Sequence, residues 1–147
     1  EMMLCCTYGC NGIYSLGNSE SGWPCHGMEH ALSAYYDITH GEGLAIITPR
    51  WMKHILNGKT VDRFMKYGVN VFCIDASLDK FEIANKAIDE TYKFFESINI
   101  PMHLKDVGID EKRIDEMAKH VAENEGLEEA WAPLLEKDIA EIFRDSL

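Results

Sequence analysis

Three of the six histidines, His26, His30 and His40, lie in the short segment between Cys25 and Gly43. His26 and His30 are four residues apart, so on a helix their imidazoles project from one face on successive turns. Neutral imidazoles at this spacing are typical ligands of a metal ion. The segment therefore predicts a metal site as the main chemistry of the chain.

His40 can join such a site only if the chain turns back before it. On an unbroken helix His40 would lie about 21 Å further along the axis than His26, whereas imidazole nitrogens lie about 2.0–2.1 Å from the ion that they bind. We therefore expect the helix to end before His40. The β-branched residues in 37–41 are poor helix formers and Gly41 permits a positive φ, so this segment is expected to reverse the chain.

The motif His-Gly-Met-Glu-His at His26–His30, followed by His-Gly-Glu-Gly at His40–Gly43, lies in a run that extends to Met52. This run resembles the metal-binding segment of the iron-containing (group III) alcohol dehydrogenases, especially their butanol-dehydrogenase-like branch. In that family the first histidine of the pair and the histidine of His-Gly bind a divalent metal, usually Fe²⁺ and sometimes Zn²⁺. The resemblance therefore implies His26 and His40 as metal ligands. His30 matches a histidine that lies where nicotinamide and substrate meet, which implies a catalytic role.

The same resemblance implies the context of the site. Family members are longer proteins, with an N-terminal nucleotide-binding domain and then an all-helical lobe that carries the metal. Residues 1–147 look like the C-terminal part of that lobe, as one helical domain. Two further ligands, an Asp and a His, would belong to the missing N-terminal part of the same enzyme, together with the site for NAD or NADP. The complete enzyme would interconvert a small primary alcohol, such as butanol, and its aldehyde, while the chain alone is expected to be inactive.

Two other functions fit parts of the sequence. The run from His26 to His30 also matches the His-x-x-Glu-His signature of inverted-motif zinc peptidases, in which both histidines bind Zn²⁺ and the glutamate, here Glu29, is the general base. That hypothesis leaves the His-Gly-Glu-Gly motif at His40 unexplained. A non-enzymatic helical interaction module would account for the absent nucleotide motif, but not for the histidines.

Composition limits the class of protein. With 147 residues and 46% hydrophobic residues, the chain can bury one core. A net charge of −11 without a basic cluster argues against a nucleic-acid partner. We expect no membrane partner and a cytoplasmic location, because no apolar run approaches the roughly 20 residues of a membrane helix and no signal peptide is recognisable.

The five cysteines are odd in number and unevenly spaced, which favours reduced thiols over a disulfide framework. A zinc site that combines them with His26 would lack the usual paired Cys-x-x-Cys spacing. The cysteines that could contribute to it are Cys5, Cys6, Cys10 and Cys25. Of the remaining histidines, His54, His103 and His120 belong to no recognisable motif.

Apolar residues recur at three- and four-residue spacing along most of the chain, which predicts an all-α, bundle-like lobe. Apart from the histidine segment, helices are expected to end at Asn11-Gly12, to span 44–57 and 60–72, to run from Asp79 toward Pro101 and from Asp110 toward Gly126, and to begin near Leu135. A kink is expected at Pro49, a loop at 13–23, and a short strand at 69–74 is an alternative. The sequence contains no Gly-x-Gly-x-x-Gly motif for a dinucleotide.

Removal of the rest of such a lobe would uncover the inner faces of 44–57 and of Met2–Cys10. Exposed apolar patches of more than a few hundred Å² tend to be covered by a partner. We therefore expect a homo-oligomer, as a closed small assembly because the negative charge opposes open-ended aggregation.

Overall fold

The helical periodicity is realised as seven α-helices in the computed structural model, which describes residues 1–13, 16 and 22–147. The described residues contain no β-strand. The helices are α1 (Met2–Cys10), α2 (Pro24–Tyr36), α3 (His40–Ile55), α4 (Val61–Phe72), α5 (Lys80–Ser97), α6 (Ile114–Asn124) and α7 (Glu136–Asp145). Short 3₁₀ turns lie at Leu104–Val107, Glu111–Arg113 and Leu127–Glu129. No helix in the described ranges is long and apolar enough to cross a membrane.

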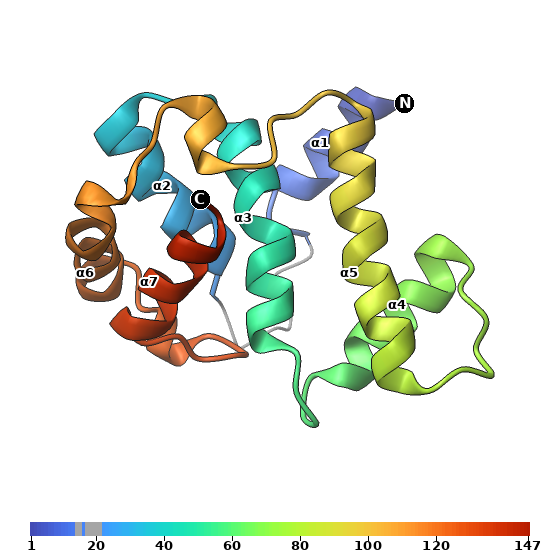
Figure 1. Ribbon diagram of the computed structural model, residues 1–147. Coiled ribbons are helices and arrows are strands. Elements are labelled where there is room, and N and C mark those ends of the chain that lie inside the picture. The colour runs from blue at the N-terminus through green and yellow to red at the C-terminus, as the bar shows by residue number, and fades with distance from the viewer. Residues whose placement is uncertain (14–15, 17–21) are drawn as a thin grey trace.

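The long helix α3 lies in the middle of the molecule (Figure 1). It contacts α2 and α7 on one side and α5 on the other, and α4 pairs with α5 at the outer edge. Helices α6 and α7 pack together, and α6 also contacts α2. The main core lies among these helices, with Met28, Leu32, Ile46, Ile47, Met117 and Phe143 fully buried.

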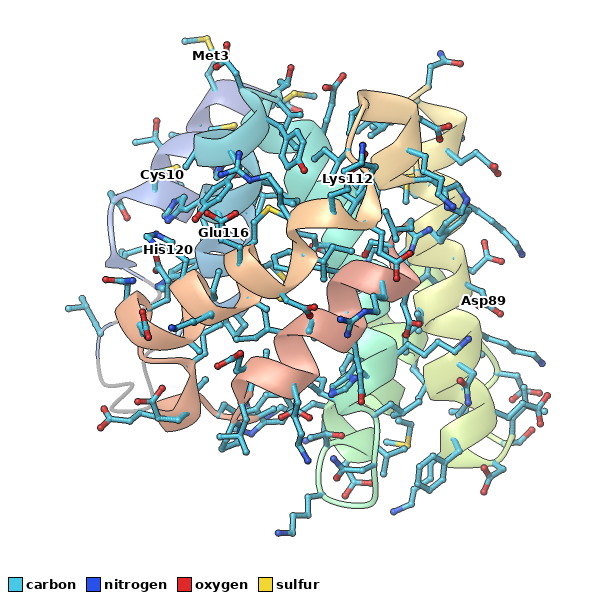
Figure 2. The ribbon with its side chains drawn as sticks, turned by 60° about the vertical axis from the view of Figure 1, so that its left-hand side comes forward. Met3, Cys10, Asp89, Lys112, Glu116 and His120 are labelled. Atoms are coloured by element: carbon cyan, nitrogen blue, oxygen red, sulfur yellow. The ribbon has the colours of Figure 1, made fainter. Side chains whose placement is uncertain are left out.

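Helix α1 differs from the others because it buries none of its residues. Its apolar side chains therefore face solvent, and Met3 projects away from the body of the molecule (Figure 2). The helix ends at Cys10, next to the predicted Asn11-Gly12 stop, and Gly12 has a φ of 78°.

Most predicted helix ends are confirmed by local chemistry. The Asp79 carboxylate accepts hydrogen bonds from the backbone N–H groups of Phe81 and Glu82, at 2.8 and 3.3 Å, and so caps α5. Gly126 follows the end of α6 with a φ of 60°, a conformation that favours glycine.

Two predictions are wrong or incomplete. The alternative strand at 69–74 is wrong, because α4 continues to Phe72 and ends at Cys73 in the left-handed conformation. The helix expected at 44–57 begins four residues earlier, at His40. Pro49 lies inside α3, and the helix continues past it to Ile55, so the kink expected there stays a prediction. Most of the loop expected at 13–23 falls outside the described residues.

Candidate metal centre

The turn between α2 and α3 brings the three histidines together. Helix α2 carries His26 and His30 and ends at Tyr36. Asp37 then adopts the left-handed conformation, with φ 53° and ψ 41°. Its backbone N–H donates a hydrogen bond to the Ser33 carbonyl. A short polar Asp side chain tolerates this conformation better than most residues. The predicted chain reversal therefore exists.

The residue that makes this reversal is Asp37, not Gly41 as predicted. Gly41 lies in the first turn of α3 and is not among the glycines with a positive φ. Thr39 precedes α3 in an extended conformation, and His40 is the first residue of that helix. The second histidine motif therefore begins a helix, although it was predicted to lie in the turn.

The imidazole rings form a compact group. The ring centroids of His26 and His40 are 5.2 Å apart and the rings are tilted by 57°. Two imidazoles that share a tetrahedral ion at about 2.1 Å have centroids about 5 Å apart, so this pair has a suitable spacing. The rings of His30 and His40 are 5.9 Å apart but nearly parallel, at 22°. The lone pairs of two stacked rings do not converge on one ion, so the geometry favours the pair His26 and His40.

The three imidazoles do not form a three-histidine cage. Within the part of the chain that the structure describes, they do not bring three nitrogens within 4.8 Å of one another. The centre thus offers two imidazoles at a suitable spacing, which is fewer than the donor set that a divalent metal usually needs.

Glu29 lies behind His40 and is fully buried. One carboxylate oxygen is bonded to Nδ1 of His40, and the other accepts from the hydroxyl of Ser33. A carboxylate on Nδ1 fixes the ring orientation and leaves Nε2 for a metal. From the sequence, the only role predicted for Glu29 was that of general base in the alternative peptidase function. Because Glu29 is fully buried and both of its oxygens are bonded to protein groups, the arrangement argues against that role.

Close packing of α2 against α3 holds Glu29 in place. A Cβ atom on Gly43 would lie 2.7 Å from Cγ of Glu29 and 2.9 Å from one of its carboxylate oxygens. Real Cβ contacts are not that short, so a glycine is required at this position of α3. The second glycine of the His-Gly-Glu-Gly motif therefore makes room for the carboxylate that orients the histidine.

The local electrostatics favour the neutral form of His26. Partial burial, and then the nearby imidazoles of His40 and His30, lower its pKa below the usual 6.5, while Glu29 has the opposite effect. An imidazole must be neutral to bind a metal. His26 is thus available as a ligand at neutral pH.

A surface cavity of about 410 Å³ lies beside the histidines and is lined by His26 and His30 together with Trp23 and Glu125. His30 is the most exposed of the three imidazoles, with 57% of its side chain accessible, and its Nδ1 lies 3.6 Å from a carboxylate oxygen of Glu125. The site is therefore open to a ligand from the His30 side.

The cysteines do not join the centre. Cys5, Cys6 and Cys10 are exposed on α1, and burial raises the pKa of the Cys25 thiol to about 11. Zinc binds thiolates, so a thiol that stays protonated is a poor ligand. All five cysteines are free.

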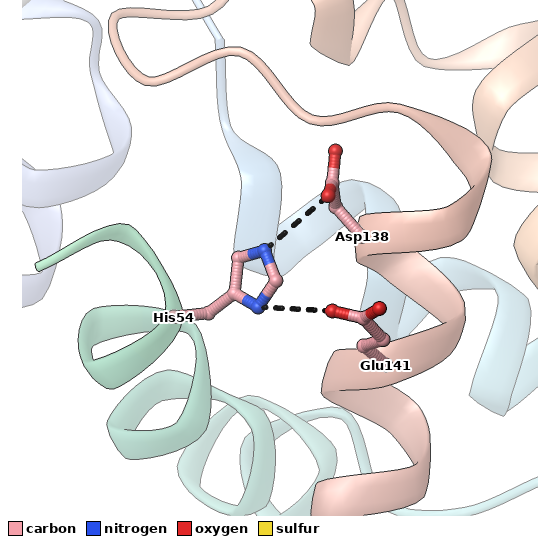
Figure 3. A group of neighbouring side chains, drawn as sticks. All are labelled: His54, Asp138 and Glu141. Atoms are coloured by element: carbon pink, nitrogen blue, oxygen red, sulfur yellow. Dashed lines mark ion pairs between the residues drawn. The ribbon is translucent and has the colours of Figure 1, made fainter.

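His54 lies in a group that sequence reasoning missed. Its imidazole faces Asp138 and Glu141, which α7 brings to the last turn of α3 (Figure 3). The two carboxylates are more than eighty positions away in the sequence, so no local motif could reveal the group. His103 and His120 are exposed, as expected for residues outside any motif.

Known proteins similar to this chain agree with the family resemblance seen in the histidine segment. The sequence profile described as "Fe-containing alcohol dehydrogenase family, C-terminal" matches residues 1–147. NADH-dependent butanol dehydrogenase A of Clostridium acetobutylicum is 46% identical over 147 residues, which cover 99% of this chain and 38% of that protein. Butanol dehydrogenase B of the same organism is 43% identical, over all of this chain and 38% of its own length.

A solved structure shows the same helical arrangement. The crystal structure of NADH-dependent butanol dehydrogenase A from Thermotoga maritima superposes with a TM-score of 0.81 at 32% identity, over 95% of this chain and 36% of the other. The predicted all-α class and family are thereby confirmed. The chain spans less than two fifths of the length of these relatives. It belongs to the Fe-containing alcohol dehydrogenase family and corresponds to the C-terminal part of its members.

Proposed function

We propose that residues 1–147 are a single helical domain that contributes part of the metal centre of an NAD(H)-dependent alcohol dehydrogenase. The reaction would interconvert a small primary alcohol, such as butanol, and its aldehyde. The observation that carries the proposal is the pair His26 and His40 with Glu29 buried behind His40. NAD(H) rather than NADP(H) is proposed because both clostridial relatives are named as NADH-dependent.

In this proposal His26 and Nε2 of His40 hold a divalent ion, Fe²⁺ as the family description implies or Zn²⁺. When bound, the ion supplies Lewis-acid polarisation of the alcohol or aldehyde oxygen. Glu29 keeps the proton of His40 on Nδ1, so that Nε2 presents its lone pair. The nucleotide and the remaining metal ligands would come from the other part of the same enzyme.

His30 is proposed to move a proton. Its Nδ1 faces Glu125, which leaves Nε2 to exchange a proton with the substrate hydroxyl or with water in the adjoining cavity. Imidazole is the side chain best suited to exchange protons near neutral pH. His30 would also orient the substrate, since it lines the cavity on the open side of the centre.

The exposed apolar residues of α1 suggest which partners the domain contacts. The exposed apolar face of α1 is proposed to contact the other part of the enzyme or, when that part is absent, a second copy of this chain. We also propose a cytoplasmic location, supported by five free cysteines, a state typical of a reducing compartment.

The proposal predicts weak metal binding and no turnover by this chain alone, because two imidazoles are fewer than the three or four protein ligands of most zinc sites. Titration with Zn²⁺, followed by NMR of the imidazole rings, should perturb His26 and His40 together. His40→Gln should abolish the response of His26, while His103→Gln should leave it unchanged. A response of His26 and His30 without His40 would favour the peptidase pair. Tightly held stoichiometric iron with butanol oxidation by NAD⁺ would contradict the shared centre.

A further inference from the structure

A second group of metal-ligand side chains lies at the other end of α3, away from the histidine pair. His54 is in the last turn of α3, and Asp138 and Glu141 lie one turn apart on the same face of α7. Nε2 of His54 is 3.6 Å from a carboxylate oxygen of Asp138, and Nδ1 is 4.0 Å from one of Glu141. The group therefore joins two helices that contact each other in the core.

These distances are too long for direct hydrogen bonds. Charge-assisted hydrogen bonds between nitrogen and oxygen measure about 2.7–2.9 Å. Instead, one donor atom from each of the three residues lies within 4.8 Å of the other two. Ligand atoms around a tetrahedral ion are about 3.3 Å apart when each is about 2.0 Å from the ion. Small side-chain adjustments would thus let the three atoms bind a single ion.

The structure holds Asp138 in a suitable orientation. Its second carboxylate oxygen accepts the backbone N–H of Leu135 at 2.9 Å and so caps α7. This hydrogen bond turns the remaining oxygen toward His54 (Figure 3). A carboxylate that is fixed through one oxygen is a preorganised ligand through the other.

The surroundings are also suited to a bound cation. The side chains of His54 and Asp138 are only 21% exposed, and both line a cavity of about 340 Å³. A second cavity, of about 530 Å³, also reaches His54. An ion held by three protein atoms beside these cavities would keep an open position for water or a small ligand.

Charge favours a divalent ion at this place. The two carboxylates carry two negative charges, and within the described residues His54 is the only basic side chain within 4.0 Å of either. One imidazole with two carboxylates is a donor set that suits Zn²⁺ and related ions, whereas Ca²⁺ and Mg²⁺ prefer oxygen alone.

We propose that His54, Asp138 and Glu141 form a second divalent-metal site, for Zn²⁺ or an ion of similar chemistry, which links the end of α3 to the start of α7. The site is separate from the pair His26 and His40 and does not depend on the function proposed for it. A protonated His54 paired with both carboxylates is the alternative that an experiment must distinguish.

The test uses the 147-residue chain with His26→Gln and His40→Gln, so that the first centre cannot contribute. Calorimetric titration with Zn²⁺ at pH 7.5 should show one ion per chain. At a hundredfold excess of free Zn²⁺ over the dissociation constant, the melting temperature should rise by about 5–10 °C. His54→Gln, Asp138→Asn and Glu141→Gln should each weaken binding at least about tenfold. Asp138→Asn retains an oxygen that can accept the N–H of Leu135, so it removes the ligand charge and keeps the helix cap.

Two controls and a second measurement make the result decisive. His103→Gln and Glu136→Gln remove an exposed histidine and a neighbouring acid of α7, and neither should change the affinity. In the unsubstituted chain, the ring NMR signals of His54 should shift on addition of Zn²⁺, which requires no variant to fold. Absence of saturable binding up to about 1 mM Zn²⁺, or binding that the three ligand variants leave unchanged, would overturn the site and favour the ion pair.

Discussion

At the scale of single residues, Glu29 fixes the orientation of the His40 imidazole. The carboxylate is fully buried and is bonded to Nδ1 of His40 and to the hydroxyl of Ser33. A buried charge of this kind is stable only with such partners. Its position between His26 and His30 in the sequence gave no indication that it contacts His40, because that contact depends on the reversal at Asp37.

Glu29→Gln is expected to weaken metal binding at the pair His26 and His40 by about 10–100-fold, the usual effect of losing a residue that orients a ligand. The amide is close in shape to the carboxylate, so the fold should persist, as circular dichroism can verify. Glu42→Gln is the matched control, because it removes a carboxylate in the first turn of α3 and not the hydrogen bond to His40. Zinc titration followed by imidazole NMR measures both. Equal affinities for the two variants would show that Glu29 does not orient His40.

At the scale of elements, hydrophobic spacing predicted where the helices lie better than where they begin. Ile46, Ile47 and Ile55 lie within the helix predicted at 44–57, and the structure buries all three on α3. The start of that helix at His40 was not predicted, because Gly41 and Gly43 are poor helix formers. Tertiary packing overrides this low propensity, since the close approach of α2 and α3 requires the absence of a side chain at Gly43.

These two glycines offer a matched pair of substitutions. Gly43→Ala should destabilise the chain by about 1–3 kcal/mol, because its methyl group would overlap Glu29 in a packed interface. Gly41→Ala should be neutral or stabilise by up to about 1 kcal/mol, since nothing lies within 4 Å of the added atom and alanine favours the helix. Denaturant unfolding measures both changes. A similar effect of the two substitutions would mean that packing against Glu29 does not select glycine at position 43.

At the scale of the whole molecule, one part of the expected apolar surface is absent. The inner face of the helix around 44–57 was predicted to be uncovered, but Ala45, Ile46 and Pro49 are buried. Helix α3 contacts α2, α5 and α7 within this chain, so its apolar face is already covered. The other expected segment, α1, is the one that remains exposed.

Self-association is therefore predicted to proceed through α1. The side chains of Met2 and Met3 are 80% and 85% exposed, and Leu4 and Tyr8 lie on the same short helix. A two-fold pairing of α1 helices would cover these residues on both copies. The charge of −11 opposes larger assemblies. Sedimentation at micromolar concentration should then show a concentration-dependent dimer.

Substitutions on α1 can distinguish a specific α1 contact from nonspecific association through exposed apolar residues. Met3→Glu combined with Leu4→Glu should give a monomer, because paired helices would have to bury four added charges in an apolar contact. Phe94→Glu is the control, since Phe94 is an exposed apolar residue on α5, at 54% accessibility. It should leave the dimer intact. If the unsubstituted chain sediments as a monomer and binds little of a hydrophobic dye, then α1 does not mediate self-association and its apolar side chains are covered within the chain in solution.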